Sequence, residues 1–100
     1  MPPQHYALIE NHSGDVWWVG DAETPEAACL LADAETDARG WDHERFEERA
    51  DLDSTESGYL VYSAPADFGF GDGKDTSRIA AVAAMPLVGK FKGVPRKKES

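Results

Sequence analysis

The chain has 100 residues, of which 41% are hydrophobic and 29% charged, and its net charge at pH 7 is −9. This composition is typical of one small globular domain and excludes both a disordered chain and two separately cored units. Residues 1–73 hold seventeen of the nineteen carboxylates and three of the ten cations, so they carry −14, while residues 74–100 carry +5. Such a field repels nucleic acid and anionic membranes from most of the surface and attracts basic partners.

The first half of the chain predicts a hairpin followed by a helix. Residues 5–11 and 16–21 are rich in strand-forming residues, and a Ser-Gly-Asp turn joins them. Thr24 and Pro25 then supply an N-cap and a first helical residue, and Gly40 ends the helix. A helical repeat of apolar residues predicts that the buried face of this helix consists of Ala27, Leu30, Leu31, Ala34 and Ala38.

The second half predicts three further strands and a short helix. We expect residues 45–52 to form a strand that pairs in a second hairpin with the clear strand at 58–63. Residues 41–57 also fit a short helix, and this alternative stays open. A glycine-rich loop over residues 64–75 leads into a helix over residues 76–85. A last strand is expected over residues 87–93.

The element order is strand, strand, helix, strand, strand, helix, strand. It predicts an α+β fold, with an antiparallel sheet of about five strands and two helices on one face. Residues 1–93 are expected to form this single domain, and residues 94–100 a basic flexible tail. Cys29 is the lone cysteine, and the chain shows neither a secretory signal nor an apolar run that could span a bilayer, so we expect a cytoplasmic protein.

The glycine-rich stretch over residues 68–76 lacks the spacing of a phosphate-binding loop. That motif needs a glycine before its Gly-Lys pair and a hydroxyl directly after the lysine, and this chain has Phe68 and Asp75 at those positions. Asp67 and Asp72, with Asp75, do not follow the alternation of a calcium-binding loop. We therefore predict no bound cofactor and no metal.

Nothing in the sequence indicates nucleophilic catalysis. His5, His12 and His43 show no zinc or catalytic spacing, and the serines lack the context of a nucleophile elbow. Cys29 falls opposite the predicted apolar helix face, so we expect it to be partly exposed among acids that raise the pKa of a thiol. The chain is therefore predicted not to be an enzyme.

Two tryptophans and a set of acids form the candidate partner-binding surface. On a strand, Trp17 and Trp18 should point to opposite sides, so one belongs to the core and the other is an interface aromatic or lies under a loop. Glu26, Asp33 and Asp37 are expected along the outward side of the helix, where a line of like charge is destabilising and a binding role would explain it. The predicted partner-binding residues are Trp17, Trp18, Glu26, Asp33, Asp37, Asp42, Glu44, Glu47 and Glu48.

These features favour a non-enzymatic acidic binding protein, monomeric or homodimeric, that docks on a basic and nucleic-acid-binding surface of a partner such as a nuclease. By analogy of charge and size it would act as an inhibitor or nucleic-acid mimic, like anti-restriction, anti-CRISPR and antitoxin proteins. The alternative is a small enzyme or a ligand- or metal-binding domain that uses the loop at 67–76. A third possibility is nucleic-acid binding by the basic end, with Phe91 stacked on a base and phosphates bound by Lys90, Lys92, Arg96, Lys97 and Lys98. The last possibility is that the acidic surface has no binding role and only aids solubility.

Overall fold

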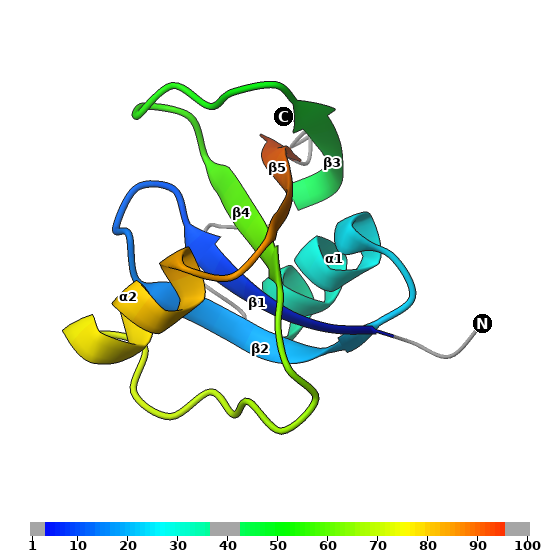
Figure 1. Cartoon of the computed structure of the whole chain (residues 1–100). Coiled ribbons are helices and arrows are strands. Elements are labelled where there is room, and N and C mark those ends of the chain that lie inside the picture. Colours follow the sequence, from blue (N-terminus) through cyan, green and yellow to red (C-terminus); the bar gives the residue numbers. More distant parts are fainter. Residues whose placement is uncertain (1–3, 37–42, 96–100) are drawn as a thin grey trace.

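The computed structural model describes residues 4–36 and 43–95. Its elements follow the predicted order (Figure 1): β1 (Gln4–Glu10), β2 (Val16–Ala22), α1 (Pro25–Thr36), β3 (His43–Arg49), β4 (Gly58–Ser63), α2 (Thr76–Ala83) and β5 (Leu87–Pro95). The strands form one antiparallel sheet in the order β2-β1-β4-β5-β3. The predicted α+β fold is confirmed, and its last strand runs two residues beyond the expected end at residue 93.

The expected hairpin between β3 and β4 is not formed. Strand β3 lies at the edge of the sheet and pairs with β5, whereas β4 lies between β1 and β5. The sequences explain this order, because β4 reads GYLVYS and is apolar enough for a central position. Strand β3 reads HERFEER, and charged residues are typical of a protected edge.

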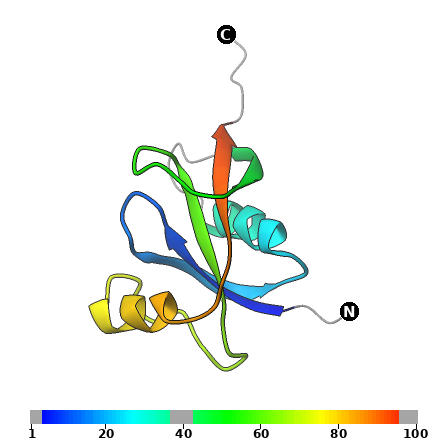
Figure 2. The same cartoon turned by 45° about the horizontal axis from the view of Figure 1, so that its top comes forward.

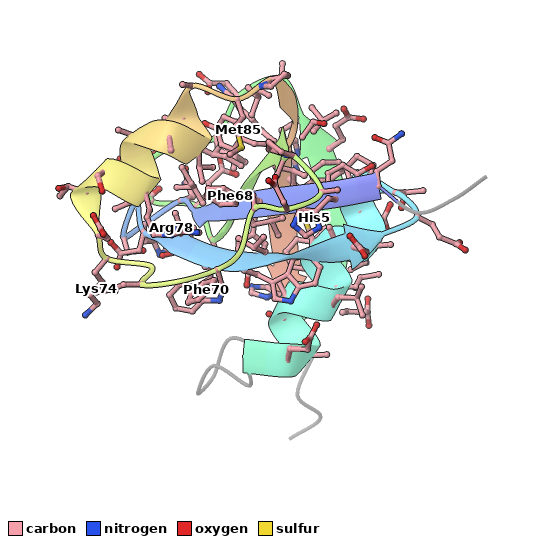
Figure 3. The ribbon with its side chains drawn as sticks, turned by 60° about the horizontal axis from the view of Figure 1, so that its bottom comes forward. His5, Phe68, Phe70, Lys74, Arg78 and Met85 are labelled. Carbon is pink, nitrogen blue, oxygen red and sulfur yellow. The ribbon has the colours of Figure 1, made fainter. Side chains whose placement is uncertain are left out.

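The two helices cover opposite faces of the sheet, so their predicted placement on one face was wrong (Figures 2 and 3). Leu8 of β1 belongs to the core cluster that includes Cys29 of α1. Its neighbours Ala7 and Ile9 belong to a second cluster with Val82 of α2. Since successive strand residues point to opposite sides, an apolar run in β1 needs cover on both of them.

Helix α1 faces the sheet with the side opposite to the predicted one. Ala28, Cys29 and Ala32 are fully buried, while Leu30 and Leu31 are each 40% exposed. Large aromatic side chains from the strands fill this half of the core, so the helix packs against them with small residues. The expected partial exposure of Cys29 was therefore wrong. Burial raises the pKa of its thiol.

Aspartate substitutions two residues apart test this orientation of α1. Ala32→Asp should lower the free energy of unfolding by more than about 3 kcal/mol, because it places a carboxylate between the helix and the sheet. Ala34→Asp makes the same chemical change at an exposed position and should lower that free energy by only about 1 kcal/mol, through helix propensity and the helix dipole. Urea unfolding of both variants provides the measurement, and equal losses would contradict the orientation.

Candidate binding surface

Trp17 and Trp18 pack on the same side of the sheet, so their predicted placement on opposite sides was wrong. Trp18 pairs with Leu8, and the next pair along the ladder is offset by one residue, which makes Trp17 the extra residue of a β-bulge. Both indoles then contact the core under α1, where Trp18 is 8% exposed and Trp17 partly buried. The Trp18 indole N–H donates to Glu35 of α1 at 2.9 Å.

Asp33 is buried and does not lie on the outward side of α1 as expected. One of its carboxylate oxygens accepts a hydrogen bond from the backbone N–H of His43 at 2.9 Å, and the other lies 2.9 Å from His43 Nδ1. The second ring nitrogen, His43 Nε2, lies 2.9 Å from Ser57 Oγ. The three side chains form a chain of hydrogen bonds between α1, the start of β3 and the end of the β3–β4 loop. No sequence motif signals it, because its members are ten and fourteen residues apart.

This order of groups is that of a Ser-His-Asp catalytic triad, but its surroundings favour a structural role. His43 is 6% exposed, and its ring lies against the backbone of Gly93, where a Cβ atom would approach the ring to 2.4 Å. The ring centroid of Phe46 lies 5.1 Å away on the same strand. The Ser57 carbonyl oxygen accepts from the Gly93 N–H at 2.8 Å, which fixes the residue from a second side. We interpret the network as one that satisfies buried polar groups.

Substitutions in this network should act on stability. His43→Leu leaves the Asp33 carboxylate buried without its ring partner and should cost about 3 kcal/mol of unfolding free energy. Ser57→Ala removes one hydrogen bond and should cost about 1 kcal/mol, whereas Ser54→Ala, exposed in the same loop, should be neutral. Denaturant unfolding provides these values. Hydrolysis of p-nitrophenyl acetate that disappears in Ser57→Ala, without loss of stability, would contradict the structural assignment.

The three acids of β3 are exposed or half-buried, and two of them are ion-paired with arginines. Glu47 accepts from Arg49 at 2.9 Å and from Arg45 at 3.1 Å, and Arg45 also bonds Glu44 at 3.0 Å. The hydrogen bonds from Arg49 and then Arg45 lower the pKa of Glu47. Glu48 is exposed on the same strand. This edge of the sheet therefore presents mixed charge and not a purely acidic surface. Asp37 and Asp42 lie outside the described residues.

The basic end does not offer the stacking group that nucleic-acid binding would use. Phe91 is 6% exposed and belongs to the core under α1, so its expected role in stacking was wrong. Lys90 bonds Asp51 at 2.9 Å, and Lys92 lies 3.2 Å from Glu56. Both lysines thus have acidic neighbours that would compete with phosphates for them.

The outward side of α1 combines exposed apolar and acidic side chains. Leu30 and Leu31 are each 40% exposed, and Ala34 is exposed beside them. At 3.6 residues per turn, Glu26 and Glu35 fall on opposite flanks of these three residues, and both are exposed. We call this surface, made by Glu26, Leu30, Leu31, Ala34 and Glu35, the outer face of α1. Of the predicted partner-binding residues it contains Glu26.

The glycine-rich loop forms a pocket with β2. The segment between β4 and α2 passes beside β2, and Phe70 and Lys74 lie near the α2 end of that segment (Figure 3). Trp17 and Phe70 line the pocket together with Asp15, Asp72 and Lys74, and its volume is about 340 Å³. The sequence suggested Trp17 as a site residue and this loop as an alternative site, but not that the two would meet.

His5 anchors the start of this loop to the sheet. Its Nδ1 lies 2.6 Å from a carboxylate oxygen of Asp21, and its Nε2 lies 2.6 Å from the carbonyl oxygen of Phe68. Both partners only accept hydrogen bonds, so both are satisfied when the ring carries two protons. Burial lowers the pKa of His5, but the bonds to Asp21 and Phe68 and the charges of Asp21 and Asp67 outweigh this and raise it.

The His5 anchor should make stability depend on pH. Because the pKa is raised in the folded state, its stabilisation is fully present below about pH 6.5, the unfolded value, and is lost as pH rises through the folded value. The melting temperature should therefore fall between about pH 6 and pH 8.5 by more in the wild type than in His5→Gln. Thermal unfolding at both pH values tests this, and an identical pH profile for the two proteins would contradict it.

Comparison of the chain with family models, with curated proteins and with solved structures gave no match. Within residues 4–36 and 43–95, no helix has the length and apolar character needed to cross a membrane. In the same residues, no three His, Cys, Asp or Glu side chains are grouped to hold a metal ion.

Proposed function

We propose that this chain is a non-enzymatic acidic binding protein that docks, through the outer face of α1, on a basic surface of a partner protein. The observation that carries the proposal is the pair of exposed leucines, Leu30 and Leu31, on a helix whose inner side is packed with small residues. A leucine pair flanked by carboxylates at Glu26 and Glu35 has the composition of an interface with an apolar centre and a polar rim.

Covering the leucines would add affinity that the charges alone do not supply. Removing the exposed part of each side chain from water contributes about 1 kcal/mol. Exposed ion pairs contribute less, but they steer the encounter and select the partner. The leucines would therefore act as anchors, and the acids would set the association rate.

Charge identifies the kind of partner. Residues 1–73 carry −14, so two copies of this chain repel one another at long range, while a basic surface is attracted. Basic surfaces of this kind hold DNA or RNA in nucleases and related complexes, and covering one would inhibit its owner. We place this binding in the cytoplasm, which suits Cys29 as a lone buried thiol.

Capture from a lysate of the source cell at low salt tests the outer face of α1. The wild type and a Leu30→Asp/Leu31→Asp variant serve as baits, and Leu87→Asp is the control because Leu87 is 47% exposed elsewhere on the surface. We expect a basic protein that the wild type and the control retain and the double variant loses. With that protein purified, the double variant should bind at least about tenfold more weakly. Equal retention by all three baits would contradict the proposal.

Charge reversals on two different elements test the steering. Glu26→Lys on α1 should lower the association rate constant for the purified partner by about threefold to tenfold at low salt, with little change at high salt. Glu48→Lys makes the same charge change on β3 and should have a smaller effect. Stopped-flow or surface plasmon resonance provides the rates, and a larger effect of Glu48→Lys would place the interface on β3 instead.

A further inference from the structure

The pocket beside β2 combines aromatic and charged side chains. Two aromatic side chains, Trp17 and Phe70, line it together with three charged ones, Asp15, Asp72 and Lys74. Its volume of about 340 Å³ is at the small end of the range for ligand sites. This volume suffices for a small organic group, and the pocket opens to solvent.

Hydrogen bonds hold the loop wall in place. The backbone N–H of Val16 donates to the Gly73 carbonyl oxygen at 2.9 Å. Gly73 permits this approach, because a Cβ atom there would lie 2.2 Å from the carbonyl oxygen of Val16. Arg78 of α2 fixes the preceding turn, since its Nε donates to the Phe70 carbonyl oxygen at 2.9 Å and its guanidinium lies 4.6 Å from the centroid of the Phe68 ring. A pocket whose walls are already fixed loses little entropy when a ligand binds.

The charges favour a cationic ligand. The faces of aromatic rings are negative and attract cations, and two carboxylates in the lining outnumber the single ammonium of Lys74. The net charge of −9 adds a long-range attraction for cations. Lys74 and Asp72 are both exposed, so water screens their opposite contributions alike, and the half-buried Asp15 leaves the balance in favour of a cation.

We propose that this pocket binds an organic cation, an alkylammonium or guanidinium group, between Trp17 and Phe70. The site lies on β2 and the loop before α2, and the inference is independent of the proposed docking by the outer face of α1. It assigns a ligand chemistry to the glycine-rich loop. The cation would be held by the aromatic side chains and the carboxylates, and the loop needs no phosphate-binding motif for this role.

A pair of probes that differ in charge but not in shape tests this inference. Choline and its neutral isostere 3,3-dimethyl-1-butanol are titrated into labelled protein and followed by NMR at the Gly73 amide and the Trp17 indole. We expect choline to perturb both signals and to bind at least about tenfold more tightly than the alcohol. Equal binding of the two probes, or no perturbation of these signals by choline at millimolar concentrations, would overturn the proposal.

Three variants fix the sign of the ligand charge. Asp72→Asn retains a side-chain oxygen that can accept from the backbone N–H of Lys74. Asp72→Asn and Asp15→Asn should each weaken choline binding by about threefold or more, because each removes one negative charge. Lys74→Ala removes the one positive charge in the lining and should strengthen choline binding. Weaker binding after Lys74→Ala would indicate an anionic ligand and overturn the proposal.

The same titration distinguishes free ligands from side chains. Argininamide and a short peptide with a central arginine present the guanidinium as a small molecule and as a side chain. If the peptide binds more tightly, the pocket receives an arginine of a partner protein, and if choline binds more tightly, it receives a free alkylammonium. Each result supports an organic-cation site, and the outer face of α1 plays no part in it, so Leu30→Asp/Leu31→Asp should leave all these affinities unchanged.

Discussion

The packing of β1 is the constraint on which the rest of the structure depends. Its residues Tyr6 to Glu10 are all buried, so the strand is covered on both faces and along both edges. Side chains of Tyr6 and Leu8 point to one face, and those of Ala7 and Ile9 to the other. A single layer of helices would leave one of these sets in water. The chain solves this by placing α1 on one face and α2 with the preceding loop on the other.

This arrangement also determines where the candidate sites lie. On the α1 side the strands supply large aromatic groups, so the helix contributes alanines and Cys29 and its leucines remain outside. On the α2 side the helix is short, and the glycine-rich loop completes the cover with Phe68, which packs on the second cluster. The same loop continues past the edge strand β2 and meets Trp17, and so the pocket is a consequence of how that face is covered.

The sequence predicts much of the local structure and less of its assembly. Residue patterns identify all seven elements, and the expected N-cap at Thr24 is present, since its hydroxyl accepts from the Ala27 N–H at 3.0 Å. Two predictions from residue patterns failed. Strand alternation assumes an ideal strand, and helical periodicity assumes that the most apolar side of a helix is the buried one. The bulge at Trp17 reverses the alternation in β2, and the rotation of α1 exchanges its inner and outer sides. The sequence of β2 or of α1 by itself could not have prevented either error. The bulge depends on how β2 pairs with β1, and the rotation of α1 depends on the aromatic side chains that the strands contribute.

The chain of hydrogen bonds through Asp33 and His43 could not be predicted from the sequence either. In the sequence Asp33 is one of several acids on the helix, and its partner His43 lies ten residues away, so their contact is formed only in the folded chain. Because Asp33 is buried, the acids beside the exposed leucines are, within the described part of α1, Glu26 and Glu35.

Helix α1 thus places its largest apolar side chains in water and its smallest in the core. Exchanging them would force leucines against the aromatic side chains of the strands, and adding volume to a close-packed core is destabilising. The packing of the α1 face therefore accounts for the small residues on the inner side of the helix. It leaves Leu30 and Leu31 partly exposed, and the proposed function assigns them to a partner that would cover them.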